Sequence, residues 1–308
     1  MIDELIADYL LALQARGCTA HTLRWYRQSL RQFAAWLRET GSPPDPAAWT
    51  PTLLRSYICY HQTRTTARGT PVSAHQVADL VSAVRTFCRW LQAEGIVGRD
   101  LFARVPVPAR PRLVKPVLTP AQIEQLLATV RRQRRNALRD EAILLLLLDT
   151  GIRASELCGL RPEHIDWASR VARVFGKGQK ERYVPFSTIT AQAMRRYARV
   201  RPDGPTFFLS KGGRPLTVSG LDQLCRRLAE RSGVHLTPHM CRHTFSIEYL
   251  RRGGSAFALQ KTLGHTTLDV TLRYVALVTD DLVREHQEHS PVQHLLGRGR
   301  RAGVPSDR

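Results

Sequence analysis

A proline-rich basic stretch near the middle of the chain limits most strongly how this sequence can fold. Residues 104–118, RVPVPARPRLVKPVL, contain four prolines and four Lys or Arg residues. Proline removes a backbone donor and disfavours helix in the residue before it, so the stretch is predicted to be extended. Two domains are therefore expected, as the length of 308 residues also favours. The predicted segments are 1–105, a linker at 106–118, 119–290, and a basic tail at 291–308 that we expect to be disordered.

The first segment has the apolar spacing of helices throughout. Thr19 is a predicted N-cap for a helix that runs to about Glu39. Thr50-Pro51 and Ser73 are predicted to begin two later helices, because proline is tolerated at the first helical position and serine caps a helix well. The segment is therefore predicted to be a helical domain without strands.

Basic side chains form a stripe apart from the apolar face on the helix that follows Thr19, and Arg85 and Arg89 lie one turn apart on the same side of the helix that follows Ser73. We expect DNA-backbone contacts from these side chains and from the linker, at Arg24, Arg27, Arg31, Arg85, Arg89 and Lys115. The alternative is a solvated basic face, which is the usual environment of a charged stripe.

Within the second segment, the spacing of apolar residues changes from that of helices to that of strands. Short β-branched and aromatic stretches at 165–167, 170–175 and 182–186 are separated by turn residues, so they predict a small antiparallel sheet with 176–180 as a hairpin tip. Helical spacing precedes and follows them. The predicted fold class is mainly α with a small antiparallel β-sheet, divided into a helical domain and a mixed α/β domain.

The charge balance points to a polyanionic partner. Lys plus Arg number 46 against 26 for Asp plus Glu, a formal net charge of +20. Nucleic acid is the first candidate and an anionic membrane surface the second. Most of the cations are arginines, which suit bidentate phosphate contacts. Arginine enrichment from a GC-rich genome is the alternative, but it leaves the excess over acids unexplained.

The cysteines and apolar runs indicate a cytoplasmic protein, which we expect to be nucleoid-associated. The six cysteines form no C-x-x-C pair and most lie in apolar-periodic stretches, so we expect buried reduced thiols. The longest apolar run, 142–148, is too short to span a bilayer. Acidic residues interrupt the N-terminus, so no signal peptide is expected.

Tyr274 is a candidate nucleophile. It lies on a predicted helix, nine residues after His265. A phenol has a pKa near 10, so attack near neutral pH requires removal or sharing of its proton and nearby cations. Arg153 and Arg242 are candidate cations, because a guanidinium matches two oxygens of a phosphoryl-transfer transition state. A half-buried amphipathic tyrosine is the simpler explanation when Tyr274 is considered alone.

Other polar residues fit around this chemistry. His239 and Arg242 are three residues apart, so they share a face of a helix that begins near Pro238. The N-terminus of that helix would itself favour a phosphate. His243 is adjacent to Arg242, points elsewhere and is interpreted as structural. Gly264-His265 has a simple alternative as a helix C-cap followed by a hydrogen-bonding histidine.

Two further motifs could contribute to the same chemistry. Glu156 follows Arg153 by three residues and can hold its guanidinium, either as a surface pair or in support of a phosphate site. Lys177, between two glycines at the predicted hairpin tip, can donate a proton to a departing 5′ oxygen. Lys180 is the competing candidate, and a solvated turn lysine is the simpler interpretation.

Taken in order, these motifs resemble the tyrosine recombinase, or phage integrase, family in its Xer-like two-domain form. TGIRASEL resembles the first-arginine box, GKGQKERYVP the β-hairpin lysine segment, HMCRHTF the second box, and LGH with a later Tyr the nucleophile segment. Cys241 stands where the family usually has Leu. The resemblance covers nearly the whole chain. It implies Glu156 as a supporting acid and these catalytic residues: Arg153, Lys177, His239, Arg242, His265 and Tyr274.

The resemblance also implies an activity. Tyr274 would attack a DNA phosphate, form a 3′-phosphotyrosyl link and release a 5′-hydroxyl, and strand exchange would pass through a Holliday junction. Neither a metal nor another cofactor is expected, because the covalent link keeps the bond energy. The expected partner is double-stranded DNA with paired recombination sites, bound as a clamp by a homotetramer or by a mixture with a paralogous recombinase, and no membrane.

Three alternatives remain at this point. A non-catalytic DNA-binding accessory protein could have the same fold. A type IB topoisomerase-like relaxing enzyme would share the chemistry but act as a monomer. An RNA-binding role is more distant, because no module of stacking aromatic residues is found.

Overall fold

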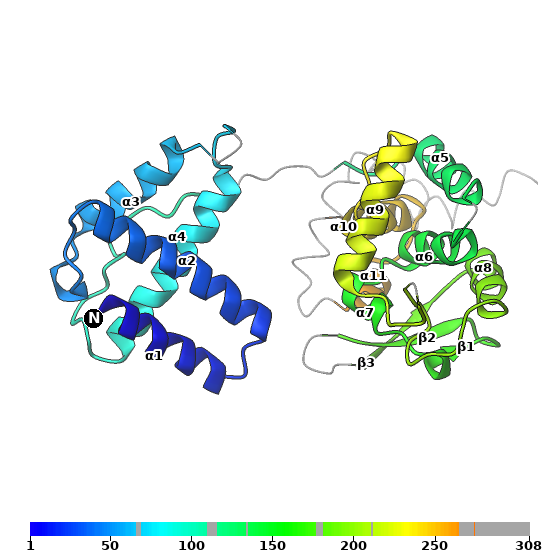
Figure 1. Ribbon diagram of the computed structural model, residues 1–308, viewed down its shortest axis with the longest axis horizontal. Helices are drawn as coiled ribbons and strands as arrows, with labels where there is room; N and C mark the ends of the chain where they lie inside the picture. The colour runs from blue at the N-terminus through cyan, green and yellow to red at the C-terminus, as the bar shows by residue number, and fades with distance from the viewer. Residues whose placement is uncertain are drawn as a thin grey trace, which may run out of the picture. The chain divides into compact units, whose positions relative to one another are not determined.

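The computed structural model describes residues 1–65, 69–109, 116–133, 135–176, 181–210, 212–264 and 274. Contacts within the chain divide it into two compact units, Met1–Val114 and Lys115–Arg308 (Figure 1). This division falls inside the proline-rich stretch. Each unit has a large hydrophobic core of its own, which is what an independent domain requires.

The first unit consists of helices and connecting turns in its described part. Its elements are α1 (Ile2–Ala15), α2 (Ala20–Glu39), the 3-10 helix η1 (Pro46–Ala48), α3 (Pro51–Thr63) and α4 (Ala74–Ala93). Thr19 accepts a hydrogen bond from the backbone N–H of Thr22 at 3.3 Å, as expected of an N-cap. Ser73 and Gln76 form a capping box at the start of α4. These caps fix the starts of the two helices that carry the predicted DNA-contacting arginines.

Aromatic side chains fill much of the first core. The ring of Phe33 on α2 lies 5.1 Å from that of Trp49 and 4.8 Å from that of Tyr57 on α3, both edge-on. Edge-to-face pairs of this kind favour a single packed arrangement over a fluid one. Val105 is also buried in this core, so the unit extends to the beginning of the proline-rich stretch.

The cysteines depart in part from expectation. All six are free thiols, and Cys88, Cys158, Cys225 and Cys241 are buried. The expectation of burial is wrong for Cys59, which is exposed on the side of α3 that points away from the core. None of the helices that the structure describes is long and apolar enough to cross a membrane.

The second unit is mainly helical with a small sheet. Its elements are α5 (Pro120–Arg131), α6 (Ala137–Thr150), α7 (Ala154–Cys158), the 3-10 helix η2 (Pro162–His164), β1 (Ile165–Asp166), β2 (Val171–Phe175), β3 (Glu181–Pro185), α8 (Thr188–Ala198), α9 (Val218–Ser232), α10 (Pro238–Arg251) and α11 (Ala256–Leu263). The strands are antiparallel in the order β1-β2-β3. The predicted fold class is confirmed. Residues 177–180 of the predicted hairpin tip, and 265–308 apart from Tyr274, lie outside the described residues.

A smaller apolar cluster lies between α10 and α11. It contains Leu263 of α11, Ile247 of α10 and Tyr274. Gly151 ends α6 beside it at φ 60°, and a Cβ there would lie 2.6 Å from Phe245 Cδ1 and 2.9 Å from Leu263 Cδ2. Only glycine combines this left-handed conformation with so close an approach. The turn after α6 is thereby held against α10 and α11.

Candidate active site

Arg153 stands between two helices of the second unit. Just after Gly151, it occupies the N-cap position of α7 in an extended conformation. Its backbone N–H donates to Oε2 of Glu156 at 2.8 Å, and its guanidinium donates to Oε1 of the same carboxylate at 2.9 Å. The Arg153 side chain is 37% exposed, whereas the Glu156 side chain is fully buried. A buried carboxylate thus holds an arginine that still faces solvent.

A second arginine binds the same carboxylate. Arg182 of β3 donates to both oxygens of Glu156, at 2.8 Å for the bond to Oε2. Burial by itself would raise the pKa of Glu156, but the hydrogen bonds and positive charges of Arg182 and Arg153 outweigh it and lower that pKa. Sequence reasoning missed Arg182. The available signal was strand alternation, which places Arg182 on the same face as the buried Val184.

Arg242 lies on α10 and is almost completely buried. Its guanidinium donates to the carbonyl of Gly151 at 2.6 Å and to that of Leu263 at 2.8 Å. Burial, followed by the positive charges of Arg153 and Arg182, lowers the pKa of Arg242 to about 10. The group stays charged at neutral pH. Three guanidinium groups surround one carboxylate, so the cluster keeps a net positive charge that favours an anion.

The C-terminal end of α11 brings these arginines together. Gly264 ends the helix in the left-handed conformation, and its carbonyl accepts a hydrogen bond from Arg153 at 2.9 Å. The preceding carbonyl, of Leu263, binds Arg242. The last carbonyls of a helix lack helical partners and carry partial negative charge, so they suit cations. His265 follows immediately in the sequence and lies outside the described residues.

Tyr274 lies beside this arginine cluster. It is helical and 9% exposed, and its ring centre lies 5.3 Å from that of His243. It belongs to the same apolar cluster as Leu263, whose carbonyl binds Arg242. A negative charge on Tyr274 would act to raise the pKa of Arg242, which reflects how near the two groups are. His243, which the sequence suggested to be structural, therefore packs against the candidate nucleophile.

The structure describes only some of the remaining candidate residues. His239 is exposed in the first turn of α10, three residues before Arg242. Lys177, like Lys180, lies outside the described residues. Phe175 pairs with Glu181 across the strands that lead to the lysine segment. The structure thus brings together Arg153, Glu156, Arg242 and Tyr274 from the sequence-based set.

The predicted DNA-contacting arginines of the first unit are mostly exposed. Among the residues described, no carboxylate forms an ion pair with Arg24, Arg27 or Arg31 of α2. Arg38, further along α2, differs because it binds Asp3 at 3.0 Å. On α4 the side chain of Arg89 is exposed and that of Arg85 is half-buried. Lys115 lies outside the described residues.

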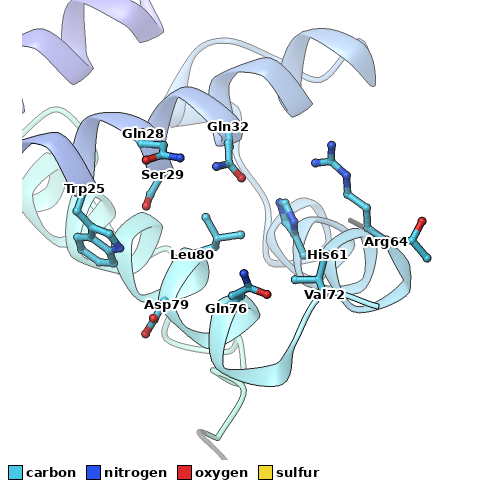
Figure 2. Close-up of a pocket in the computed structure, with 11 residues that line it drawn as sticks. Trp25, Gln28, Ser29, Gln32, His61, Arg64, Val72, Gln76, Asp79 and Leu80 are labelled. Carbon is cyan, nitrogen blue, oxygen red and sulfur yellow. The ribbon is translucent and has the colours of Figure 1, made fainter. Parts of the chain in front are cut away.

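A cavity of about 350 Å³ opens beside the arginines of α2. Figure 2 shows Gln28 and Gln32 of α2 on one side of the cavity and Gln76 of α4 on the other. His61 of α3 also lines it, with its Nε2 buried and without a hydrogen-bond partner among the described residues. Burial, followed by the charge of Arg64, lowers the pKa of His61 to about 4, so its ring is neutral at physiological pH. The cavity therefore offers amide donors and acceptors, together with the charged Arg64 and Asp79, next to a basic surface.

Comparison with known families agrees with this arrangement. Residues 116–280 match the model of the phage integrase family, and residues 6–95 match the model of the phage integrase N-terminal SAM-like domain. The chain belongs to the phage integrase family. It is a tyrosine recombinase, an enzyme of site-specific DNA recombination. The first match includes all the residues of the arginine cluster as well as Tyr274.

Similar recombinases cover nearly all of the chain. Tyrosine recombinase XerC of Pelobacter propionicus is 32% identical over 295 residues, covering 94% of this chain and 95% of the relative. Tyrosine recombinase XerC of Mycobacterium tuberculosis is 33% identical over 313 residues, covering 94% and 98%. The relative of the same name in Bacillus subtilis is 27% identical over 302 residues, covering 94% and 95%.

Solved structures share the fold. The integrase of the Tn1549 transposon, in complex with a circular intermediate DNA, aligns with a TM-score of 0.76 at 22% identity, covering 93% of this chain and 98% of the other. A lambda integrase dimer bound to a COC′ core site aligns with a TM-score of 0.68 at 18% identity, covering 86% and 95%. At these identities the likeness shows a shared fold only. The roles of individual residues therefore rest on the geometry of the present chain.

Proposed function

We propose that Tyr274 attacks a phosphate of duplex DNA, forms a 3′-phosphotyrosyl link and releases a 5′-hydroxyl. A 5′-hydroxyl of a partner duplex then attacks the link and restores the DNA backbone, so exchange passes through a Holliday junction. The observation that carries the proposal is the arrangement around the end of α11. The carbonyls of Leu263 and Gly264 hold Arg242 and Arg153 beside the cluster that contains Tyr274.

The two arginines would stabilise the transition state. Charge develops on the equatorial oxygens of the phosphoryl group, and fixed guanidinium groups stabilise such charge without reorganising. Arg153, which is partly exposed, is accessible to the phosphate, while the buried Arg242 raises the positive potential beside it.

Proton transfer is assigned to residues outside this cluster. Lys177 would donate a proton to the departing 5′ oxygen, His265 would bind the phosphate, and His239 would assist proton transfer. The attack transfers the phosphoryl group to Tyr274, and the phosphotyrosine retains the energy of the bond. The proposed reaction therefore needs neither ATP nor a metal ion.

DNA binding by the first unit is proposed for the exposed face of α2. Arg24, Arg27 and Arg31 would neutralise phosphates, and the amides of Gln28 and Gln32 would reach base edges from the rim of the neighbouring cavity. Arg85, Arg89 and Lys115 would extend the backbone contacts. Two basic units joined by a basic linker would then enclose a duplex.

Arg31→Gln is expected to weaken binding to every DNA sequence and to lower the slope of log affinity against log salt by about one, the loss of one phosphate contact. Arg38→Gln is the matched control on the same helix, because Arg38 already binds Asp3. Titrations of labelled duplex at several salt concentrations measure both. Equal slopes for Arg31→Gln and wild type would remove Arg31 from the proposed surface.

The relatives also suggest an assembly. The solved integrases similar to this chain include a dimer on a core site, and paired recombination sites would bring four subunits together. We therefore propose a homotetramer on two duplexes, with or without a paralogous recombinase, in the cytoplasm at the nucleoid. The segments that would join the subunits, a helix expected at about 280–289 and the tail, lie outside the described residues.

Covalent trapping tests the proposed reaction. The wild-type protein is mixed with a library of nicked duplexes, denatured in SDS, and the attached DNA is sequenced. The expected result is a protein joined to the 3′ phosphate of defined sites. Binding without any adduct would contradict the proposal and favour an accessory protein, whereas adducts at any sequence together with relaxed circles and a monomer on DNA would favour a topoisomerase-like activity.

A further inference from the structure

Three successive carbonyls at the end of α11 accept hydrogen bonds from three different arginines. The pairs are Arg182 Nε with the carbonyl of Thr262 at 2.8 Å, Arg242 with that of Leu263 at 2.8 Å, and Arg153 with that of Gly264 at 2.9 Å. The arginines come from β3, α10 and the start of α7, so only tertiary folding brings them together. The helix end acts as a common acceptor for them, because its last carbonyls lack helical partners.

Arg182 differs from the other two because all three nitrogens of its guanidinium donate hydrogen bonds within the protein. Nε binds the carbonyl of Thr262, and the two terminal nitrogens bind the two oxygens of Glu156 in the parallel fork typical of arginine and carboxylate. Its side chain is only 10% exposed. A phosphate could bind it only by displacing one of these partners, so direct contact with DNA is not its role.

Arg153 is held by the same two groups that Arg182 holds. Glu156 accepts from the backbone and the guanidinium of Arg153, and the end of α11 accepts from the other side of that guanidinium through Gly264. Arg182, Glu156, Arg153 and the end of α11 therefore form a closed ring of hydrogen bonds. Loss of the Arg182 fork would free both supports of Arg153 together.

We infer that Arg182 is a positioning residue for the phosphate-binding arginine Arg153, an inference that rests on the proposed function. Lysine cannot replace it, because an ammonium is a point charge and cannot bind Thr262 and both oxygens of Glu156 in one plane. A displacement of about 1 Å at a group that binds the transition state can cost about 100-fold in rate. The cleavage step should therefore slow without a matching loss of DNA affinity.

Arg182→Lys tests this inference in single-turnover trapping on a nicked duplex at saturating DNA. The amplitude of adduct formation reports the fraction of molecules that fold, and the rate constant reports how well the site is positioned. We expect the rate constant to fall about 100-fold, with the dissociation constant for DNA and the amplitude close to those of wild type. Arg182→Gln is measured alongside, as a second variant that can still donate to Thr262.

Arg139→Lys is the matched control. Arg139 is equally buried, pairs with the buried Asp140 at 2.8 Å and donates to the carbonyl of Leu209 at 2.9 Å. It shares no partner with the arginine cluster, so this variant should keep the wild-type rate constant. A merely structural role would make both substitutions lower the amplitude and leave the rate constant unchanged.

The outcomes separate the inference from the function on which it rests. If wild type forms an adduct and Arg182→Lys or Arg182→Gln forms it with the same rate constant, whatever the amplitude, the inference is overturned and the proposed function stands. If wild type forms no adduct with any duplex, the proposed function fails and the inference fails with it.

Discussion

Tyr274→Phe is expected to lower the rate of covalent attachment to DNA by about 10⁴-fold or more, as in enzymes that lose their nucleophile, with DNA affinity within about twofold of wild type. The substitution removes only the phenolic oxygen. The ring stays, so its contact with His243 and its place in the cluster with Leu263 remain. Quantifying adducts after SDS denaturation, beside a binding titration, measures both quantities.

Tyr249→Phe provides a control within the same apolar cluster. Tyr249 packs there with its ring centre 5.6 Å from that of Phe245. Removing its hydroxyl is expected to leave adduct formation unchanged. If Tyr274→Phe still became attached to DNA at a rate near that of wild type, another side chain would have to be the nucleophile, and the proposed mechanism would be wrong.

The features that the sequence predicted well are those that depend on neighbours in the chain. The caps Thr19 and Ser73 lie within a few residues of the groups they bind, and the pairing of Arg153 with Glu156 spans one helical turn. The small sheet was predictable because alternation and turn residues are local signals. The family resemblance added the order of the motifs, which no single motif supplies.

The features that were missed depend on contacts across long stretches of chain. Arg182 binds Glu156, 26 positions earlier, and Thr262, 80 positions later. Helical spacing shows that His243 points to a different side from its neighbour Arg242, but it cannot show that Tyr274 packs against it. A buried arginine on a strand does indicate that a carboxylate must lie near. It does not indicate which one.

Non-local contacts also explain why the same residues serve both the packing of the helices and the candidate active site. Gly151 lacks a side chain where Phe245 and Leu263 approach, and its carbonyl binds Arg242. The residue that lets the end of α6 approach α10 and α11 is thus also an acceptor for an arginine of the site. Substitutions in this region should therefore affect stability together with cleavage, which is why rate constants and amplitudes need to be measured separately.

Glu156→Gln is expected to lower the free energy of unfolding of the second unit by about 3–5 kcal/mol at pH 7, because it leaves the buried cation of Arg182 without its anion. Glu248→Gln is the control: Glu248 also pairs with an arginine three residues away, Arg251, but at the surface, so the expected change is below about 1 kcal/mol. Hydrogen exchange of peptides from α7 and β3 reports the second unit alone, which matters because two units can unfold separately.

The pH dependence gives the Glu156 prediction a second, independent readout. The arginines hold the pKa of Glu156 below its ordinary value in the folded chain, despite burial, which alone would raise it. The stabilisation is therefore fully present above the unfolded pKa of about 4.3 and is lost as the pH falls through the lower folded pKa. The difference between wild type and Glu156→Gln should be constant near neutral pH and should shrink in acid. A difference that stayed constant down to the acid transition would mean that the lost charge is not what destabilises the variant.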